Sequence, residues 1–386
     1  MISIVSIIGT RPEAIKMAPV ILELQKYSDD LRSVVCVTGQ HRQMLDQVLR
    51  VFAIEPDVDL NLMEQNQSLA SLTSRAMVAL NDVLERLKPN VVLVQGDTTT
   101  AMVASLAAFY HKIPLGHVEA GLRTGNHYSP FPEEINRQLI GVLASYHFVP
   151  TSLAAETLKR EGKDERTIFL TGNTVIDALH WVVSEKKDER ATRLLAASGV
   201  DLRNRKLILV TAHRRENFGS PLERICHAIK AIARHNPGVE ILYPVHLNPN
   251  VRSPVYRILD GEPRVHLTAP LEYEEFAHLL NLAYLVLTDS GGIQEEGPAL
   301  GKPVLVMREN TERPEAVLAG TAKLVGTDTA RLIEETERLL NDHSEYTAMA
   351  KATNPFGDGY AAKRIVEIIR SQTCLRWGSG GYVTYN

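Results

Sequence analysis

The chain is organised around one stretch, Asp289-Ser290-Gly291-Gly292-Ile293-Gln294-Glu295-Glu296. The apolar run that precedes it, Tyr284–Thr288, has the length and composition of a buried strand. Residues Gln294–Leu300 favour a helix, and Lys302–Val306 favours the next strand. The stretch therefore predicts a strand, a tight turn and a helix N-terminus, which is the repeating unit of a parallel α/β sheet.

The Ser-Gly-Gly turn is predicted to bind a phosphate or diphosphate. Two glycines without Cβ atoms let the backbone approach a ligand closely, and the first N–H groups of the helix point towards it. Glu295 or Glu296, one turn into the helix, is placed to accept hydrogen bonds from ribose hydroxyls. The alternative is an ordinary strand-to-helix turn in which Ser290 caps the helix.

Buried-type strands alternate with helical segments along the whole chain. In the first half, strands are predicted at Ile2–Ile8, Ser33–Val37, Val91–Val94, Pro114–Val118, Tyr146–Val149 and Thr167–Leu170. In the second half, they are predicted at Leu207–Val210, Val239–Tyr243, Val265–Leu267, Tyr284–Thr288 and Pro303–Val306. This alternation predicts an α/β protein of two Rossmann-like, doubly wound parallel sheets, with ligands at the carboxyl ends of the strands.

The domain boundaries are expected near residues 171 and 358. The N-terminal domain would span 1–171, and the C-terminal domain, which carries the predicted diphosphate site, would span 172–358. A long polar helix within 172–205 would hold the hinge. A last helix is predicted at Tyr360–Arg370, followed by a poorly ordered tail at 372–386.

The bulk properties fit a globular protein with a small-molecule partner. A chain of 386 residues with 44% hydrophobic and 23% charged residues can form two sizeable cores. A net charge of −4 gives no reason to expect nucleic acid or an anionic membrane as partner. The three cysteines lie far apart, and the start of the chain lacks a basic segment followed by a long apolar run. The cytoplasm is the expected location.

Charged residues follow the predicted strands of the first half. Gly9-Thr10-Arg11-Pro12-Glu13 places a cation at the end of the first strand, joined one turn later by Lys16, which suggests a phosphate clamp. Gln95-Gly96-Asp97 places a carboxylate at the end of the third strand, where the alternative is a helix cap. Both positions lie on the rim where ligands bind.

A denser group follows the fourth strand. His117–Gly125 holds a His, a Glu and an Arg, and Phe131–Arg137 opens a helix with acids in its first turn. An ordinary i,i+4 pair between Glu133 and Arg137 is the structural alternative. The functional interpretation rests on three carboxylates predicted on one rim, which are Asp97, Glu119 and Glu133.

The second half has cationic groups at the matching position. Thr211–Asn217 supplies a His and two Arg after a strand, which suits a diphosphate leaving group, and His246 offers a further imidazole. Asp57-Val58-Asp59 resembles a metal-binding pair but follows a proline in a predicted turn, so no metal is expected. His227 and His235 lie on a helix face and are expected to be structural.

Seven of these motifs together resemble the bacterial non-hydrolysing UDP-N-acetylglucosamine 2-epimerases. They are Gly9-Thr10-Arg11-Pro12-Glu13, Gln95-Gly96-Asp97-Thr98, Glu119-Ala120-Gly121-Leu122-Arg123, Phe131-Pro132-Glu133-Glu134-Ile135-Asn136-Arg137, Thr211-Ala212-His213-Arg214-Arg215-Glu216-Asn217, Asp289-Ser290-Gly291-Gly292-Ile293-Gln294-Glu295-Glu296 and Asn354-Pro355-Phe356-Gly357-Asp358-Gly359. The resemblance runs in register over about residues 1–370. It implies a glycosyltransferase-B-like fold with the active site in an interdomain cleft, a last helix at about 359–371 that returns to the first domain, a homodimer, and neither a metal nor a cofactor.

The resemblance also implies roles for particular residues. The positions that match the catalytic set are Asp97, Glu119, Glu133 and His213. The positions that match UDP contacts are Arg11, Lys16, Phe276, Ser290, Gly291, Gly292, Glu296 and Arg313. The positions that match a second, activating UDP-N-acetylglucosamine site are Gln40, Gln43, Gln67, Glu133, Arg214 and His246. An Arg common in that second site is Asn66 here.

The implied reaction is reversible inversion at C2 of UDP-N-acetylglucosamine, through elimination of UDP to 2-acetamidoglucal and re-addition, for bacterial surface polysaccharides. The sequence leaves alternatives open: a hydrolysing 2-epimerase, a 2-epimerase of a related UDP-diacetamido-uronate, or a glycosyltransferase of the same fold. A nucleotide-sugar sensor without catalysis is disfavoured by the clustered acids. Which carboxylate acts as the base in which direction also stays open.

Overall fold

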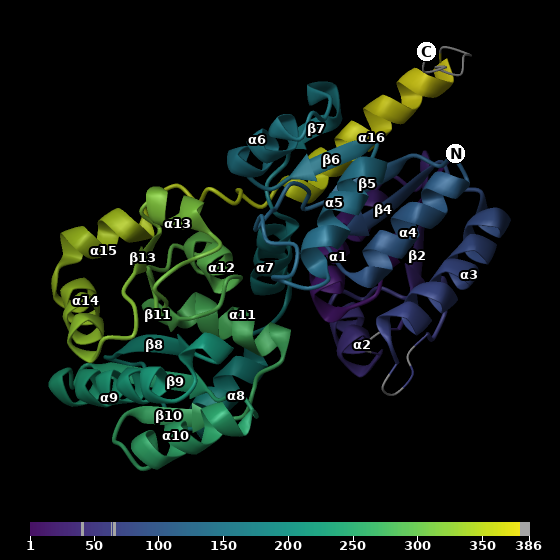
Figure 1. The fold of residues 1–386 in the computed structure, drawn as a ribbon. Coiled ribbons are helices and arrows are strands. Elements are labelled where there is room, and N and C mark those ends of the chain that lie inside the picture. Colours follow the sequence, from purple (N-terminus) through teal and green to yellow (C-terminus); the bar gives the residue numbers. More distant parts are fainter. Residues whose placement is uncertain (40–41, 63, 65–66, 379–386) are drawn as a thin grey trace. The chain divides into compact units, whose positions relative to one another are not determined.

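The computed structural model describes residues 1–39, 42–62, 64 and 67–378, with only the backbone of Arg42, Gln43 and residues 373–378. The chain divides into two compact units (Figure 1). The first unit comprises Met1–Ala178 and the segment from Phe356 onwards, and the second comprises Leu179–Pro355. Because α7 spans Thr174–Glu185, the division falls inside a helix. No helix among the described residues combines the length and apolar character needed to cross a bilayer.

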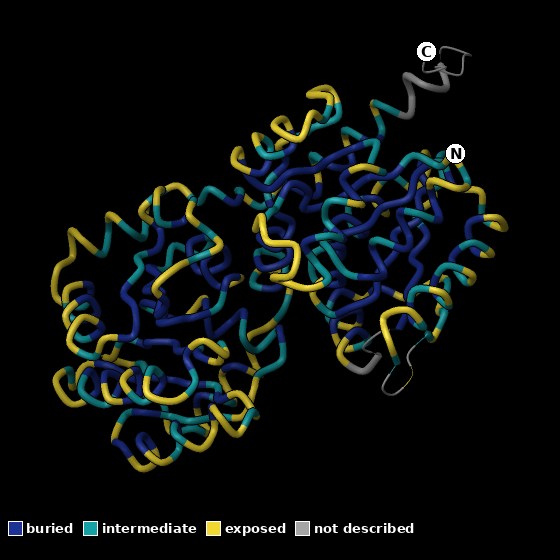
Figure 2. The backbone as a smooth tube through the Cα atoms, in the orientation of Figure 1, coloured by how far each residue is buried: buried dark blue, intermediate teal, exposed yellow. Residues whose placement is uncertain are grey.

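The first unit is built on one parallel sheet of seven strands, in the order β3-β2-β1-β4-β5-β6-β7. Every strand pair in it is parallel, and the strands are dark blue in Figure 2 where they are buried. The strands are β1 (Ile2–Ile8), β2 (Leu31–Val37), β3 (Val58–Asp59), β4 (Val91–Gln95), β5 (Leu115–Val118), β6 (Tyr146–Val149) and β7 (Ile168–Leu170).

Helices cover both faces of this sheet. Val5 and Ile7 of β1 belong to a core formed with α3, α4 and α5, so alternate residues such as Ile4 and Ile8 point to the opposite face. There α1 packs against α2 and α16. The helices are α1 (Arg11–Gln25), α2 (Arg42–Val51), α3 (Leu69–Leu87), α4 (Thr99–Tyr110), α5 (Glu133–Leu143), α6 (Ser152–Arg160), the 3-10 turn η1 (Glu165–Thr167), α7 and α16 (Ala361–Gly378).

The second unit repeats the design with a parallel sheet of six strands, in the order β10-β9-β8-β11-β12-β13. The strands are β8 (Lys206–Thr211), β9 (Val239–Pro244), β10 (Val265–Thr268), β11 (Leu285–Thr288), β12 (Val304–Val306) and β13 (Ala322–Leu324). The helical elements are α8 (Glu189–Ala197), η2 (Arg215–Asn217), α9 (Ser220–His235), α10 (Pro249–Leu259), α11 (Tyr273–Leu282), α12 (Ile293–Ala299), α13 (Pro314–Leu318), α14 (Thr329–Asn341) and α15 (His343–Ala350).

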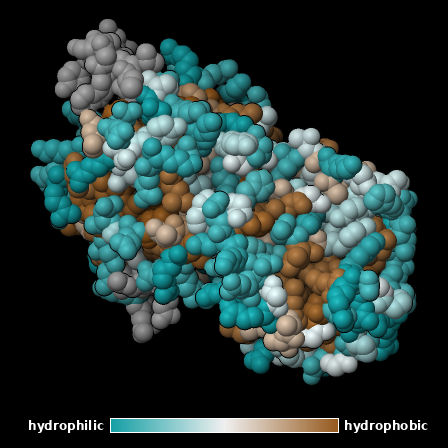
Figure 3. Space-filling model, turned by 180° about the vertical axis from the view of Figure 1, so that it is seen from behind, coloured by the Kyte–Doolittle hydropathy of each residue, from teal (hydrophilic) through white to brown (hydrophobic). Residues whose placement is uncertain are grey.

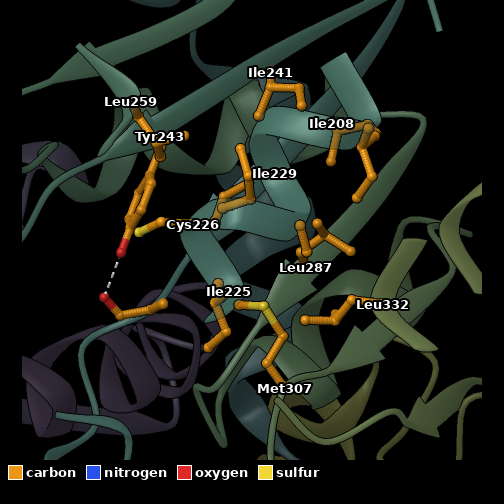
Figure 4. Close-up of a cluster of buried hydrophobic side chains, with 14 of the residues drawn as sticks. Ile208, Ile225, Cys226, Ile229, Ile241, Tyr243, Leu259, Leu287, Met307 and Leu332 are labelled. Carbon is orange, nitrogen blue, oxygen red and sulfur yellow. Dashed lines mark hydrogen bonds between the residues drawn. The ribbon is translucent and has the colours of Figure 1, made fainter. Parts of the chain in front are cut away.

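The core of the second unit supports the loop that follows β8. Figure 4 shows the side chains of α9 packed against those of β8, β9 and β11, with Tyr243 at one edge. Tyr243 is buried, and its hydroxyl donates a hydrogen bond of 2.8 Å to the carbonyl of Ala212, one residue beyond β8. A buried tyrosine needs such a partner, so the core fixes where the following residues begin.

The strand order reverses at one place in each sheet. β1 pairs with β2 on one side and with β4 on the other, and β8 pairs in the same way with β9 and β11. Chain segments that leave two such strands diverge to opposite faces, and open α/β sheets bind ligands at this position. The loops after β1 and β4, and after β8 and β11, are therefore the expected binding loops.

The structure confirms the predicted pair of parallel, doubly wound α/β sheets. It corrects three details. Asp57–Asp59, predicted as a turn, includes the edge strand β3, and the strand β13 was not predicted. The last helix was predicted to end at Arg370, but α16 continues to Gly378; the predicted tail lies outside the described residues from 379 on.

Candidate active site

Asp97 lies just beyond β4 and is held by the helix α5. Nε and Nη2 of Arg137 lie 2.8 and 2.7 Å from one carboxylate oxygen of Asp97, and the Asn136 side chain donates to the Asp97 carbonyl at 2.8 Å. The side chain of Asp97 keeps 26% of its surface exposed. Thr98, not Asp97, caps α4, so the helix-cap alternative is wrong. The carboxylate is oriented but accessible.

Glu119 is a buried carboxylate of the first unit that several side chains hold in place. It follows β5 with a φ of 65°, a left-handed conformation that is unfavourable for a side chain of this type. Lys16 Nζ lies 2.6 Å from both of its oxygens, the Asn173 amide donates at 2.9 Å, and Gln95 donates as well. A buried carboxylate surrounded by these donors holds Lys16 in place beside the loop that follows β1.

The two acids at the start of α5 have different environments. Glu134 is fully buried and accepts hydrogen bonds from the backbone N–H groups of Thr124 and Gly125, at 2.9 and 3.2 Å. Burial opposes ionisation of Glu134, but these hydrogen bonds outweigh it and lower its pKa. Glu133 is partly exposed. Arg137 pairs with Asp97 and with Glu134, which replaces the predicted pair with Glu133.

His117, singled out in the sequence, supports the loop that carries Asp97. It is buried, and Nε2 lies 2.7 Å from the carbonyl of Gly96. Burial lowers the pKa of His117 to about 3, so the ring is neutral and donates its Nε2 proton to that carbonyl. Nearby, Arg123 forms two hydrogen bonds with Glu161, at 2.8 and 2.9 Å. Both side chains have structural partners.

Glu13 was missed as a site residue. It lies in the first turn of α1 but is buried, and its carboxylate joins the loops after β1 and β4. One oxygen accepts from the Gly9 N–H at 3.2 Å and the Thr10 hydroxyl at 2.7 Å, and the other accepts from the Thr98 hydroxyl at 2.8 Å. Burial raises the pKa of Glu13 to about 7, although these hydrogen bonds oppose it. In sequence it resembles an ordinary acid at a helix start.

In the second unit, His213 and Arg214 are fixed by the buried Asp289. One carboxylate oxygen of Asp289 accepts the backbone N–H of His213 at 2.9 Å and that of Arg214 at 2.8 Å. The amide of Asn217 donates to the same oxygen at 3.0 Å. The ring of His213 stacks on that of His246, with centroids 5.6 Å apart and the planes tilted by 14°. Two imidazoles and Arg214 therefore lie together at the carboxyl ends of β8 and β9.

The Ser-Gly-Gly turn lies between β11 and α12. The N-cap residue of α12 is Gly292, so the alternative in which Ser290 caps the helix is wrong. Gly291 leaves space at the turn, since the nearest atom to a Cβ added there would be Arg214 Nη2, at 3.5 Å. Glu295 pairs with Arg313, whereas Glu296 is buried near Gly292. The turn therefore adjoins Arg214, as a diphosphate site requires.

The other candidate residues are distributed over both units. Arg11 begins α1, and Phe276 is a half-buried residue of α11. Gln67 accepts a hydrogen bond from Arg75. Gln40 and Asn66 lie outside the described residues, as does the side chain of Gln43.

Asp57 and Asp59 have ordinary structural partners. The Asp57 carboxylate accepts the N–H of Val35 at 2.7 Å, and that of Asp59 accepts the N–H of Asn61 at 3.0 Å. Within residues 1–378, as far as they are described, no group of three His, Cys, Asp or Glu side chains is arranged to hold a metal ion.

Comparison with known proteins gives one consistent result. A family model described as UDP-N-acetylglucosamine 2-epimerase matches residues 23–370. The chain is 56% identical over 371 residues to the UDP-N-acetylglucosamine 2-epimerase of Yersinia pestis, covering 95% of this chain and 98% of that protein. It is 55% identical over 370 residues to that of Escherichia coli K12, with the same coverage.

Solved structures agree with the sequence matches. The UDP-GlcNAc 2-epimerase of Neisseria meningitidis, solved with UDP-GlcNAc bound, superposes with a TM-score of 0.85 at 50% identity, over 96% of this chain and all of that one. The enzyme of Methanocaldococcus jannaschii, solved with UDP-GlcNAc and UDP, gives 0.77 at 34% identity, also over 96% of this chain and all of that one. With its two parallel α/β sheets and its motifs in place, the chain belongs to the UDP-N-acetylglucosamine 2-epimerase family.

Proposed function

We propose that this protein is an isomerase that interconverts UDP-N-acetylglucosamine and UDP-N-acetylmannosamine without net hydrolysis. The observation that carries the proposal is the distribution of charge at the two switch points. The first unit presents the oriented carboxylate of Asp97 beside α5, and the second presents His213 and Arg214 beside the Ser-Gly-Gly turn. Membership in the family indicates that the substrate is UDP-N-acetylglucosamine.

The chemistry explains why both sets are needed. The C2–H bond of an N-acetylhexosamine is not acidic, so a base alone cannot invert C2. When the bond from C1 to the UDP oxygen breaks, positive charge develops at C1 and the C2 proton becomes removable. A carboxylate takes that proton, giving 2-acetamidoglucal and UDP. Re-addition of UDP at C1, with proton delivery to the other face of C2, gives the epimer.

The side chains divide between these tasks. Asp97, Glu119 and Glu133 form the acidic set, and the accessible Asp97 and Glu133 are the ones suited to exchange protons with C2. Glu119, surrounded by donors, suits the orientation of Lys16. The groups assigned to the departing UDP are His213, Arg11, Lys16, Phe276, Ser290, Gly291, Gly292, Glu296 and Arg313. Cationic side chains that contact the diphosphate stabilise its negative charge and so lower the barrier to the departure of UDP.

A proton NMR time course with UDP-N-acetylglucosamine as sole substrate tests the function. We expect the anomeric signal of UDP-N-acetylmannosamine to grow until a constant ratio is reached, with the total UDP-sugar conserved. Accumulation of UDP and free N-acetylmannosamine would instead identify a hydrolysing enzyme. No change with this substrate, but turnover of a UDP-diacetamido-uronate, would reassign the substrate.

The same reaction in D₂O tests the proton transfers. A carboxylate that equilibrates with solvent between abstraction and return should place deuterium at C2 of the product. Product that carries only protium at C2 would contradict the proposed exchange.

We also propose that a second UDP-N-acetylglucosamine acts as activator, through the set Gln40, Gln43, Gln67, Glu133, Arg214 and His246. The stacking of His246 on His213 supports it, because a ligand at His246 would adjoin the leaving-group side. We expect the rate of the wild type to depend sigmoidally on substrate concentration, and that of His246→Ala to depend on it hyperbolically. Hyperbolic kinetics in the wild type would contradict activation. The replacement of the common Arg by Asn66 would then explain the loss of the second site.

A homodimer is proposed from the surface of the first unit. Figure 3 shows hydrophobic residues in separate patches on one face of the molecule. Single exposed apolar residues are common on protein surfaces and do not by themselves identify a dimer interface. Adjacent helices carry a larger set, however: Val78 on α3, Phe109 and Tyr110 on α4, and Leu139 and Val142 on α5. Light scattering should report a dimer for the wild type and a monomer for Val142→Asp, with Leu318→Asp in α13 as the exposed control.

The setting of the reaction is also a proposal. UDP-N-acetylmannosamine would supply bacterial surface polysaccharide synthesis, and the cytoplasm is the proposed location. Cys36 and Cys226 are buried free thiols, in keeping with a reducing compartment.

A further inference from the structure

Asp289 joins the two loops at the switch point of the second unit. It follows β11, and its N–H donates to the carbonyl of Thr211 at the end of β8, at 3.0 Å. Its carboxylate is fully buried, and one oxygen, Oδ2, accepts the three hydrogen bonds from His213, Arg214 and Asn217. Three donors on one oxygen fix the path of the chain after β8.

The other oxygen, Oδ1, has no hydrogen-bond donor among the described residues. A buried carboxylate oxygen without a donor is costly, so its nearest partner matters. That partner is Nδ1 of His213, at 3.6 Å. The distance is slightly longer than a hydrogen bond and suits an ion pair when the imidazole is protonated.

The neighbouring histidine does not compete for this oxygen. Nδ1 of His246 accepts the backbone N–H of Asn248 at 3.1 Å, so that nitrogen carries no proton. The proton of His246 is therefore on Nε2. The charged groups that face His213 are Asp289 from the end of β11, and His246 and Arg214 from the loops after β9 and β8.

We propose that Asp289 is a positioning residue that faces the Nδ1–H of His213 and favours the imidazolium form of that ring, whose Nε2–H then donates to an oxygen of the departing diphosphate. The inference rests on the proposed function for the identity of the acceptor. Within the enzyme, Asp289 acts through His213 and does not touch the substrate.

The electrostatics agree with this geometry. Burial lowers the pKa of His213, as do the nearby His246 and Arg214, whereas the charge of Asp289 acts to raise it. A diphosphate beside Nε2 would add negative charge and favour the imidazolium further. Asp289 therefore keeps His213 within reach of protonation when the leaving group develops its charge.

Asp289→Asn tests the proposal in the free enzyme. The amide oxygen can still accept from His213, Arg214 and Asn217, while the NH₂ group replaces Oδ1 and cannot hold a proton for Nδ1. Histidine titration by NMR, with the His213 signal assigned from His213→Asn, should show the pKa of His213 lowered by roughly half a unit or more. Asn217→Ala is the matched control: it removes one donor, keeps the carboxylate, and should leave that pKa in place. An unchanged pKa in Asp289→Asn overturns the proposal, as does an equal drop in both variants.

A double-mutant cycle gives a second test that does not depend on the titration. Asp289→Asn should lower kcat by about 10-fold or more in the wild-type background, and by less than about 2-fold in the His213→Asn background, because the two residues act as one unit. Equal losses in both backgrounds would show a merely structural role. If the wild type does not epimerise the sugar, the proposed function fails, and the NMR result still decides the role of Asp289.

Discussion

Each of the two units places a buried carboxylate at the switch point of its sheet, but the two carboxylates have different hydrogen-bond donors. In the first unit, Glu13 joins the loops after β1 and β4 through one backbone N–H and the hydroxyls of Thr10 and Thr98. In the second unit, Asp289 joins the loops after β8 and β11 through two backbone N–H groups and an amide N–H.

The donors decide what each carboxylate can do. A hydroxyl can both donate and accept hydrogen bonds, so Thr98 can accept a hydrogen bond from the O–H of Glu13 when that carboxyl is protonated. A backbone N–H only donates, so the loop after β8 requires Asp289 as an acceptor. Burial without a cation raises the pKa of Glu13 to about 7. The first switch point therefore tolerates a change of charge, and the second is built to keep a negative charge beside His213.

The largest expected effect is on kcat and comes from Asp97, the carboxylate of the first unit that is proposed to take part in proton transfer. Asp97→Asn keeps the shape of a side chain held by Arg137 but removes a proton acceptor, so kcat should fall by about 10²–10⁴-fold with a smaller change in KM. The measurement is the NMR rate assay at saturating substrate. Asp164→Asn, an exposed acid beyond the site, is the control. A kcat within a few-fold of the wild type would remove Asp97 from the proton transfer.

The next effect concerns the charge on Glu13. Because the pKa is about 7 in the folded protein and ordinarily 4.5, the folded chain keeps a proton that the unfolded chain loses between these values. The contribution of Glu13 to the free energy of unfolding is therefore fully present below pH 4.5. It falls as the pH rises from 4.5 to about 7, and above that it no longer changes. Glu13→Gln cannot titrate, so its free energy of unfolding relative to the wild type should rise by about 2–3 kcal/mol between pH 5 and 8.

Urea unfolding at several pH values measures this difference. Asp164→Asn should show no change relative to the wild type between pH 5 and 8, because hydrogen bonds from Arg166 lower the pKa of Asp164 to about 2 and its contribution is lost only in strong acid. A Glu13→Gln profile parallel to that of the wild type would mean that Glu13 stays ionised and that the two switch points do not differ.

A smaller effect is expected from the glycine of the first binding loop. A Cβ at Gly9 would lie 2.4 Å from the Thr100 hydroxyl and 2.8 Å from Thr100 Cβ. Gly9→Ala should therefore cost about 1–3 kcal/mol of stability, as overpacking does. Thermal or urea unfolding measures it, and a stability equal to that of the wild type would show that the loop can move aside.

The smallest effect on stability is expected at Gly291, in the loop after β11 of the second unit. A Cβ at Gly291 would meet Arg214 Nη2 at 3.5 Å and Glu312 at 3.8 Å, which are ordinary contacts. Gly291→Ala should change stability by less than about 0.5 kcal/mol. Its KM should nevertheless rise several-fold if the diphosphate approaches this backbone. An unchanged KM would place the diphosphate elsewhere.

Most of the fold followed from local patterns in the sequence. Apolar runs bounded by turns located eleven strands, since most of these runs are buried on both faces of a parallel sheet and need no alternation. The edge strand β3 was missed because two residues are too few to give a pattern, and the edge strand β13, of three residues, was missed as well. Lys323 in the middle of β13 also interrupts the apolar pattern that marks a buried strand.

The site was predicted less completely, because its support comes from distant residues. Motifs placed Asp97, Glu119 and His213 at strand ends, where the structure has them. The role of Glu13 depends on Thr98, 85 residues away, and that of Asp289 on His213, 76 residues away. An acid in a first helical turn or before a Gly-rich turn gives no local sign of such partners.

Asn173 carries a consequence for anyone who wishes to express the first unit alone. Its amide donates to Glu119, its backbone N–H donates to the carbonyl of Phe356 at 2.7 Å, and its side-chain oxygen accepts from Val175. Asn173 thus links Glu119 to Phe356, which lies almost two hundred residues further along the chain. A fragment that ends at Ala178 would lack the Phe356 carbonyl that holds Asn173, whereas a fragment to which the segment from Phe356 onwards is joined would regain it.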